Sequence, residues 1–319
     1  MGSLIRGFAL TDLVAPEREP SIAEGVTVDE LEALSDKPES FGRQAWDRFR
    51  QHRVANIGAI LLVLVIVAFV VGPWLSPHEP ETTSVLERNE GPSLNHPFGT
   101  DDLGRDLMAR VFSGGRIWLM IALIVSVCAT IVGTTLGAIA GYSGRFVDAT
   151  ISQATNLFQA IPLLPLLLVF AIEFGSSPIS MALLLSAFVW FRSARLVRGQ
   201  FLTFKNMDFV QAARAAGAKP SRIIFRHILP NTIGPVLVEA TLLAGLAIIL
   251  ESTLSFLSLG VQPPATSLGV LVDEGRGFIT SRPTRILLPG AFITIIVLSI
   301  NFLGDGLRDA LDPTSRSDD

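Results

Sequence analysis

Residues 54–75 read Val-Ala-Asn-Ile-Gly-Ala-Ile-Leu-Leu-Val-Leu-Val-Ile-Val-Ala-Phe-Val-Val-Gly-Pro-Trp-Leu, and no charged side chain interrupts them. A helix rises about 1.5 Å per residue, so about 20 apolar residues cross the roughly 30 Å hydrocarbon core of a bilayer. This stretch therefore predicts a membrane-spanning helix. The residues before it hold no short apolar core followed by a small-residue cleavage site, so we do not expect it to be a signal peptide.

Further stretches of similar length carry little or no charge. Of the 319 residues, 49% are hydrophobic and 17% are charged, and the mean hydropathy is +0.50. A soluble domain of this size is less apolar. We therefore predict an all-α fold, a polytopic membrane bundle of six transmembrane helices. The further spans are predicted at 117–144, 149–172, 174–191, 286–304 and 231–257, the last containing Glu239 and Glu251.

The distribution of basic residues predicts the orientation of this bundle. The stretch 192–230, between the fourth and fifth spans, is rich in Arg and Lys, whereas the turn near Ser176 and Ser177 has neither. Because basic loops stay on the cytoplasmic side, we predict that this loop and both termini are cytoplasmic. The predicted order is an acidic cytoplasmic tail with an interfacial helix (1–53), the first span (54–75), an external segment (76–115), a core of spans two to six (116–306) and a cytoplasmic tail (307–319).

The charge, the cysteine count and the absence of several catalytic and nucleotide-binding motifs argue against several classes of function. A net charge of -4 and an isoelectric point near 5.6 argue against a nucleic-acid partner. The single cysteine, Cys128, can form neither an intrachain disulfide nor a thiol metal site. The lysines, Lys37, Lys205 and Lys219, do not follow glycine, so no phosphate-binding loop is predicted. With no zinc-protease or serine-nucleophile motif either, we predict no catalytic residue, no metal and no cofactor.

Three glycines in the second span recur at every fourth residue, at Gly133, Gly137 and Gly141. This spacing places them on one face of a helix. A glycine stripe lets another helix approach closely, which matters in lipid because helices there gain no hydrophobic drive from associating. We predict that this span is buried in the bundle.

The most informative cytoplasmic stretch, 208–231, reads Asp-Phe-Val-Gln-Ala-Ala-Arg-Ala-Ala-Gly-Ala-Lys-Pro-Ser-Arg-Ile-Ile-Phe-Arg-His-Ile-Leu-Pro-Asn. Its first residue is predicted to cap a short helix, with Gln211 reaching back to form a capping box. Gly217 suits the left-handed residue that ends this helix. We expect a second helix to begin near Pro220 and to stop before Pro230. The pattern predicts a helix-turn-helix beneath the membrane.

This stretch resembles the EAA loop of ABC importer permeases, and Arg-His-Ile-Leu-Pro-Asn at 226–231 resembles its peptide-transporter version. The sequence departs from the family pattern at Gln211, where Glu is usual. The resemblance implies that the loop couples the membrane helices to separate ATPase subunits. The coupling residues that it implies are Gln211, Ala212, Ala213, Gly217, Arg226, His227 and Pro230.

The external segment carries a second resemblance. His-Pro-Phe-Gly-Thr-Asp-Asp-Leu-Gly-Arg-Asp-Leu at 96–107 and Gly-Gly-Arg at 114–116 resemble a signature of dipeptide and oligopeptide permeases. We expect Thr100 or Asp101 to cap a helix on which Asp106 precedes Arg110 by one turn. The apolar stripe predicted for this helix is Leu103, Leu107 and Val111.

Two other interpretations of the external segment involve ligands or catalysis. A calcium site at Asp101, Asp102 and Asp106 is one, but the spacing lacks the alternating oxygen ligands of a calcium loop. A membrane hydrolase using His78 or His96 is the other, and no base or nucleophile stands near either histidine in the sequence. We therefore favour the interpretation that these residues cap and support a helix over both a calcium site and a hydrolase site.

Two more stretches, 250–264 and 301–313, resemble signatures of the same permeases, so the resemblance covers about 54–313. It implies a permease subunit of an ATP-driven peptide importer in the cytoplasmic membrane of a prokaryote, working by alternating access. The implied partners are a second related permease, two ABC ATPase subunits, an extracytoplasmic solute-binding protein and the peptide. Nickel chelates, glutathione and sugars are the alternative cargoes.

The carboxylates of the fifth span leave two questions open. Glu251, with Ser255 one turn later, should face protein or the transport pathway, because a lipid-facing carboxylate costs roughly 3 kcal/mol. It either fixes the bundle by hydrogen bonding or lines the pathway and attracts a peptide ammonium group. An ion-coupled carrier using Glu239 and Glu251 is the rival class, but such a carrier has no need of the basic loop at 192–230.

Overall fold

The computed structural model describes residues 41–174 and 177–311. The chain divides into two units after Arg43, and the unit that begins at Gln44 contains every helix from α3 onward. The predicted acidic tail, 1–40, and the last part of the predicted C-terminal tail, 312–319, lie outside the described residues.

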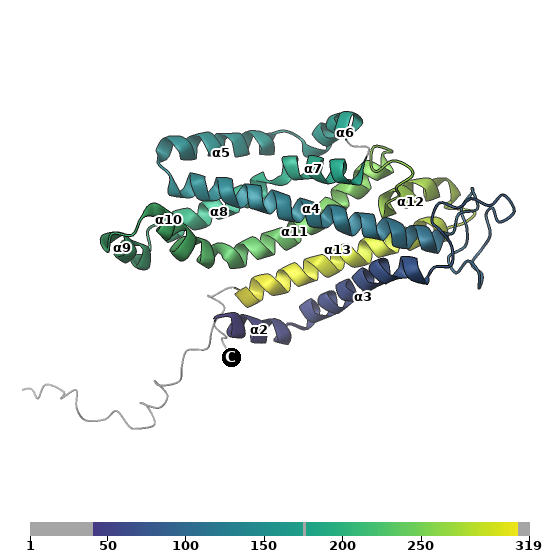
Figure 1. Cartoon of the computed structure of the whole chain (residues 1–319), viewed down its shortest axis with the longest axis horizontal. Helices are drawn as coiled ribbons and strands as arrows, with labels where there is room; N and C mark the ends of the chain where they lie inside the picture. The colour runs from purple at the N-terminus through teal and green to yellow at the C-terminus, as the bar shows by residue number, and fades with distance from the viewer. Residues whose placement is uncertain (1–40, 175–176, 312–319) are drawn as a thin grey trace, which may run out of the picture. The chain divides into compact units, whose positions relative to one another are not determined.

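Helices make up all the regular elements of the described residues, apart from one isolated bridge between Thr100 and Asp106 (Figure 1). This confirms the all-α prediction. In chain order the elements are α2 (Phe41–Gln51), α3 (Arg53–Leu75), α4 (Leu107–Tyr142), α5 (Arg145–Ala160), α6 (Leu163–Phe174), α7 (Pro178–Val189), α8 (Phe191–Phe204), α9 (Asp208–Ala215), α10 (Pro220–Ile223), a π-helical turn (Ile224–Ile228), α11 (Leu229–Phe256), α12 (Leu268–Gly275), a 3-10 turn (Arg276–Phe278) and α13 (Thr284–Leu311).

Four helical runs are long and apolar enough to cross a membrane: α3, α4, the run from α10 through α11, and α13. Two bent pairs pass the same test of length and composition, α5 with α6 and α7 with α8. If each bent pair is one span, the bundle has the six spans that the sequence predicts.

The third predicted span, 149–172, is not one straight helix. It divides into α5 and α6, which meet at an angle of 88°. Pro162 stands at the break, where proline supplies no backbone N–H and restricts the residue before it. The fourth span also differs, because α8 continues to Phe204 after a 41° bend. The first part of the predicted loop 192–230 is therefore helix.

The predicted end of the second loop helix before Pro230 is wrong. From Pro220 the chain runs through the π-helical turn and Pro230 into α11 as one run that ends at Phe256. The turn is wider than an α-helix, and the Leu229 backbone N–H donates to the carbonyl of Ile224, five residues earlier. This change of hydrogen-bond register lets the helix pass a proline without ending.

The predicted external helix also begins later than expected. α4 starts at Leu107, and its N-cap is Asp106, whose side chain accepts a hydrogen bond from the Ala109 backbone N–H. Thr100 and Asp101 lie in the preceding loop, so neither is the cap. The shorter helix cannot carry the predicted stripe, because Leu103 lies outside it.

The glycine stripe of α4 packs against α8, as predicted. A β-carbon added at Gly133 would lie 2.5 Å from the carbonyl oxygen of Trp190, and one at Gly137 would meet the carbonyl oxygen of Ala194. In Figure 1, α4 crosses the bundle, and α8 packs along one part of its length. Because Gly133 and Gly137 have no side chains, α4 and α8 can approach each other this closely.

Three apolar clusters form the interior of the bundle. One joins α4, α6, α7 and α11, and a second joins α3, α4, α12 and α13. The third lies at the end of the bundle that carries α9 and α10. The α3–α4 loop (76–106) and α12 lie at the opposite end (Figure 1).

Candidate functional site

The predicted coupling loop is fixed to the bundle by its own small core. Val210 of α9 is fully buried together with Val197 and Phe201 of α8, and with Ile223 and Ile228 from the run that leads into α11. Burying such side chains contributes about 1.5 to 3 kcal/mol each. A displacement of α9 must therefore move α8 and α11 or break this packing.

The start of α9 does not use the predicted capping box. Met207 is the N-cap residue, Asp208 is the first residue of the helix, and no side chain completes the cap. The Gln211 side-chain amide donates instead to the carbonyl oxygen of Lys205 at 3.3 Å. Gln211 also accepts a hydrogen bond from Arg214 at 3.3 Å.

The end of α9 does have the predicted left-handed glycine. Gly217 has φ +82°, a backbone conformation that L side chains rarely adopt. The Ala218 backbone N–H donates to the carbonyl of Ala213, and that of Gly217 donates to the carbonyl of Arg214. These bonds form a helix-ending turn from which the chain can start α10 at Pro220, in a new direction.

The structure brings the predicted coupling residues together at one end of the bundle. Ala213 and His227 are half-buried, and the others are exposed. Two aromatic side chains stand among them, Phe209 with 42% and Phe225 with 68% of its surface exposed. Aromatic and arginine side chains are enriched at protein interfaces, so their presence here suits contact with a protein partner. The exposed members are Gln211, Ala212, Gly217, Arg226 and Pro230.

Glu251 and Ser255 lie elsewhere, inside the bundle. Glu251 is fully buried and accepts a hydrogen bond from the Ser255 hydroxyl at 2.7 Å. The Ser255 hydroxyl is also 3.3 Å from that of Ser267, which caps α12. The second carboxylate oxygen of Glu251 and the indole Nε1 of Trp118 are buried without a hydrogen-bond partner. In this conformation Glu251 has no contact with solvent.

Glu239 has a different environment. Its carboxylate accepts from the Arg192 Nε at 3.1 Å, an ion pair that joins α11 to the start of α8. The two carboxylates of α11 therefore make separate contacts, one with an arginine and one with a serine. This does not favour a pair of proton- or ion-coupling sites.

We expect Glu251→Gln to leave transport close to normal. The glutamine side-chain oxygen can still accept the hydrogen bond from the Ser255 hydroxyl, and the substitution removes a buried carboxylate of which one oxygen has no partner. Glu251→Ala should instead destabilise the chain by about 1 to 3 kcal/mol, because the buried Ser255 hydroxyl loses its carboxylate acceptor. Uptake assays and thermal melting of both variants check this. A strong loss of uptake in Glu251→Gln, with normal melting, would support the pathway role instead.

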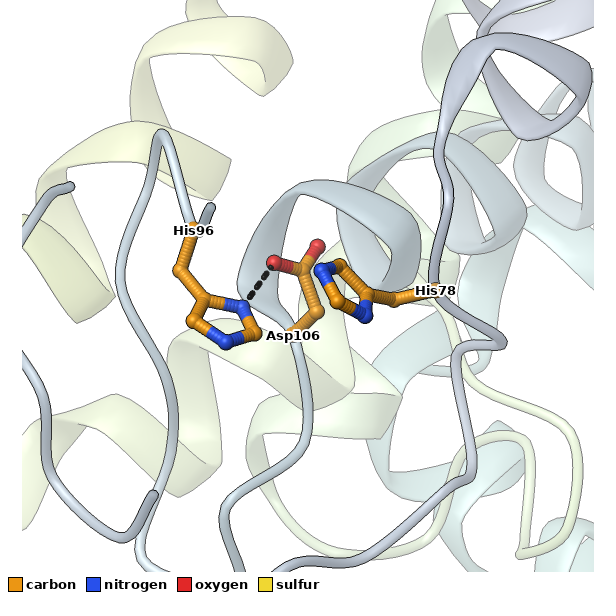
Figure 2. A group of neighbouring side chains, drawn as sticks. All are labelled: His78, His96 and Asp106. Atoms are coloured by element: carbon orange, nitrogen blue, oxygen red, sulfur yellow. Dashed lines mark hydrogen bonds and ion pairs between the residues drawn. The ribbon is translucent and has the colours of Figure 1, made fainter. Parts of the chain in front are cut away.

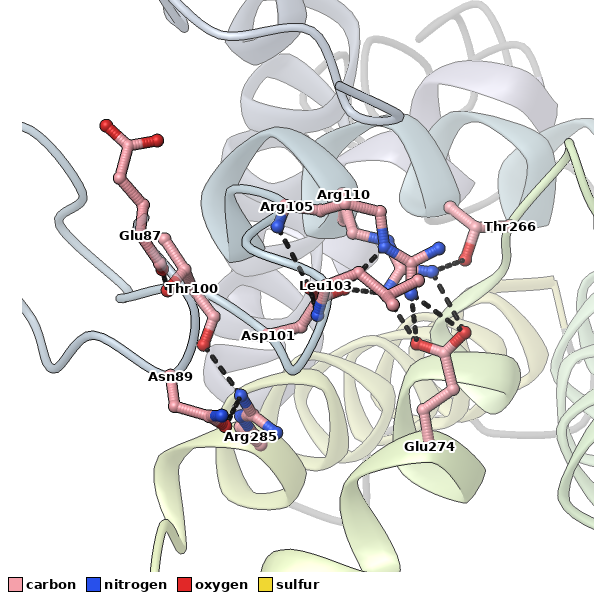
Figure 3. Close-up of polar contacts among 10 residues, drawn as sticks. All are labelled: Glu87, Asn89, Thr100, Asp101, Leu103, Arg105, Arg110, Thr266, Glu274 and Arg285. Carbon is pink, nitrogen blue, oxygen red and sulfur yellow. Dashed lines mark hydrogen bonds and ion pairs between the residues drawn. The ribbon is translucent and has the colours of Figure 1, made fainter. Parts of the chain in front are cut away.

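An ionic network joins the α3–α4 loop, α4 and α12 at the end of the bundle opposite α9 and α10 (Figure 3). Arg110 donates to Asp101 at 2.9 Å and to Glu274 at 3.1 Å. Arg105 also donates to Asp101, through its side chain and its backbone N–H. Arg285 of α13 donates to the carbonyl of Thr100 at 3.0 Å. The loop is thus held against three helices.

The network corrects one expectation about the predicted external segment and agrees with the argument against a calcium site there. Arg110 pairs with Asp101 and Glu274 and not with Asp106, and Glu274 lies 164 residues away in the sequence. Burial raises the pKa of the Asp101 carboxyl, but the Arg105 backbone N–H and the Arg110 charge more than offset this, so the pKa lies below its ordinary value. Asp101 therefore serves two arginines, which removes it from a calcium site.

Comparison with known proteins identifies the family. Residues 133–317 match binding-protein-dependent transport system inner membrane components. The chain belongs to this family. Residues 40–92 match the N-terminal transmembrane domain of oligopeptide transport permease C. As a member of this family, the chain is a transport permease subunit, and its apolar helices make it a multi-pass protein of the inner membrane.

Individual relatives agree with this assignment. The chain is 38% identical to the oligopeptide transport system permease protein OppC of Bacillus subtilis (strain 168), over 93% of this chain and 97% of that protein. It is 40% identical to the dipeptide transport system permease protein DppC of Alkalihalophilus pseudofirmus, over 86% and 90% respectively. The fold is similar to that of the inward-facing MetNI methionine ABC transporter, with a TM-score of 0.55 and 21% identity over 65% of this chain and 98% of the solved chain.

Proposed function

We propose that the chain is the membrane permease subunit of an ATP-driven importer of dipeptides or oligopeptides. The observation that carries this proposal is the exposed end formed by α9 and Gly217, which is joined by a buried core to α8 and α11. The peptide cargo is supported by relatives named as oligopeptide and dipeptide permeases, which match most of the chain.

In this proposal the energy comes from other subunits. The chain has no phosphate-binding loop, so two ABC ATPases would bind the exposed α9 end, and a second related permease would complete the pathway. An extracytoplasmic solute-binding protein would deliver the peptide at the opposite end, and both termini would be cytoplasmic. Phe209 and Phe225 are the exposed side chains best suited to anchor an ATPase, because aromatic residues carry much of the binding energy at protein interfaces.

The core around Val210 gives a physical route for coupling. When the ATPases close, they would displace α9, and its packing on Phe201 would carry the displacement to α8. Ile223 and Ile228, which share this core, would carry the displacement to α11 along the continuous run from Pro220. Since α8 packs on the glycine stripe of α4, these helices would tilt together to open the pathway alternately.

The experiment is peptide uptake into proteoliposomes that contain the full importer, with the solute-binding protein outside and ATP inside. We expect uptake that requires ATP and all the subunits. Uptake that continues with an uncoupler present, but stops without ATP, would distinguish the importer from an ion-coupled carrier. ATP-independent uptake by the chain alone would overturn the proposal.

Gly217→Val should uncouple ATP hydrolysis from uptake. An added β-carbon meets nothing within 4 Å, so the effect comes from the φ of +82°, which costs a non-glycine residue roughly 1 to 2 kcal/mol. A cost of this size lowers the population of the native turn at the end of α9 by about 5- to 30-fold, and uptake should fall with that population. Uptake and ATP hydrolysis measured on the same proteoliposomes check this.

Gly217→Asn is the matched control, because asparagine tolerates the left-handed conformation better than other L residues. We expect it to retain most of the uptake, while valine at the same position does not. Equal uptake by the two variants would show that the conformation of Gly217 has no part in coupling.

The cargo is tested separately from the ATP requirement. We expect unlabelled dipeptides and oligopeptides to compete with the labelled peptide, and glutathione, sugars and nickel chelates not to compete. Competition by one of those solutes alone would assign the importer to that cargo, while leaving its permease role intact.

A further inference from the structure

Two histidines and an aspartate from different parts of the α3–α4 loop meet beside the N-terminus of α4. His78 follows α3, His96 lies later in the α3–α4 loop, and Asp106 caps α4 (Figure 2). One nitrogen of each histidine and one carboxylate oxygen lie within 4.8 Å of one another. His96 and Asp106 are buried, whereas His78 is half-buried and leaves the cluster open to a small ion.

We propose that His78, His96 and Asp106 bind a divalent transition-metal ion, for which Zn²⁺ is the probe. Two imidazoles and one carboxylate form a donor set that zinc accepts, with water in a fourth position. Magnesium and calcium prefer all-oxygen sites, so they fit this cluster poorly. The site is independent of the cargo and of the ATPase contacts proposed above.

The aspartate is held in a position to act as a ligand. Its Oδ1 accepts from the Ala109 backbone N–H at 2.7 Å, which fixes the carboxylate at the start of α4. Its Oδ2 is left facing the His96 Nδ1, at 2.8 Å. Ligand atoms bound about 2.1 Å from a tetrahedral zinc are roughly 3.4 Å apart, so this pair needs to separate by only about 0.6 Å.

The histidines are also oriented by their surroundings. Their rings are stacked, with centroids 4.5 Å apart and planes tilted by 26°. The other nitrogen of His96, Nε2, lies 3.8 Å from a carboxylate oxygen of Glu87. Metal-binding histidines commonly direct their second nitrogen at a carboxylate, which sets the ring orientation and strengthens the ligand. Glu87 is placed for this role.

A bound ion would connect the end of α3 to the start of α4. His78 stands two residues after Ser76, which is the C-cap of α3, and Asp106 is the N-cap of α4. Without an ion, the side chain of His78 contacts this region through the Asn95 carbonyl, 3.1 Å from its Nε2, and through the ring stacking. The ion would therefore brace the α3–α4 loop, and the predicted consequence is a higher melting temperature.

The experiment measures Zn²⁺ binding by the full chain, purified in detergent with a tag that contains no histidine. Competition against a chromophoric chelator should show one site, and the metal content after gel filtration should approach one Zn²⁺ per chain. His78→Gln should weaken binding at least tenfold, and Glu87→Gln should weaken it about tenfold, since Glu87 acts on the ligand and not on the metal. Zn²⁺ should raise the melting temperature of the wild type but not of His78→Gln.

His52→Gln is the matched control, because His52 pairs with Asp309 at 3.3 Å and is not part of the cluster. It should bind Zn²⁺ like the wild type. His78→Gln decides the outcome, because His78 is only half-buried and the variant should melt normally in the absence of metal. Equal Zn²⁺ affinity in His78→Gln and the wild type, or no binding by the wild type, would overturn the proposal.

Discussion

Gly133→Ala is expected to destabilise the chain by about 1 to 3 kcal/mol, the usual cost of adding a methyl group to a closely packed site. The new β-carbon would lie 2.5 Å from both the Trp190 carbonyl oxygen and the Ser193 β-carbon. The Trp190 carbonyl oxygen belongs to the backbone of α8's N-terminal end, so it cannot rotate away as a side chain could. α4 and α8 must therefore separate, and thermal melting of the purified chain should show the loss.

For Gly199→Ala we expect no loss of stability. Gly199 lies in α8, and a β-carbon there meets nothing within 4 Å. In a helix, alanine is favoured over glycine by roughly 0.5 to 1 kcal/mol, so this variant should be as stable as the wild type or more stable. If both variants melted alike, the close approach of α4 and α8 would not limit stability.

The sequence predicts the helical bundle well because lipid imposes a simple requirement. A spanning helix needs a long apolar run with few charges, and such runs are visible without any knowledge of tertiary contacts. The glycine stripe was informative for a related reason, since close helix contact in lipid depends on small residues at regular spacing. Gly133 and Gly137 meet α8 as the spacing indicates.

Helix boundaries and bends were predicted less well, because they depend on local hydrogen bonding. Pro162 marks a break of 88° between α5 and α6, whereas Pro230 marks no break at all, because a π-helical turn precedes it. Each proline directly follows an aliphatic residue, so the residue before the proline does not separate the two cases. Likewise Asp106 caps α4 because its carboxylate faces Ala109, while Asp101 faces two arginines.

The candidate sites also differ in how far the sequence predicts them. The α9 end follows from one continuous stretch of sequence, and its left-handed Gly217 has a local signature. The His78, His96 and Asp106 cluster forms where one irregular loop folds back on itself, and the Arg110 network joins that loop to α12, so no spacing rule predicts either of them. The sequence predicts no metal site because His78, His96 and Asp106 do not stand at the short, regular intervals of the known metal-binding motifs.

Arg110→Met is expected to have the largest effect, a loss of about 3 kcal/mol, because it removes one of the two arginines that pair with the buried Asp101 carboxylate. The loss lies at the low end for breaking a buried ion pair, because Arg105 still donates to Asp101. The side chains of Arg110 and Asp101 are 4% and 5% exposed, and water cannot replace the lost contact easily. Glu274 is 35% exposed and can be hydrated, so most of the loss should come from Asp101. Thermal melting measures the loss, and Arg116→Met, which changes an exposed arginine of the same helix, should melt nearly normally.

A second substitution and a pH series test whether the buried charge is the cause. Asp101→Asn combined with Arg110→Met removes both charges, so it should recover part of the stability lost in Arg110→Met alone. The pKa of Asp101 is lowered from its ordinary 3.8, so its ionised form stabilises the wild type above that pH and this contribution is lost as pH falls through the folded pKa. The wild type should therefore lose stability in acid more steeply than Asp101→Asn. If the double variant melted no higher than Arg110→Met, then lost packing, and not the buried charge of Asp101, would explain the lower stability of Arg110→Met.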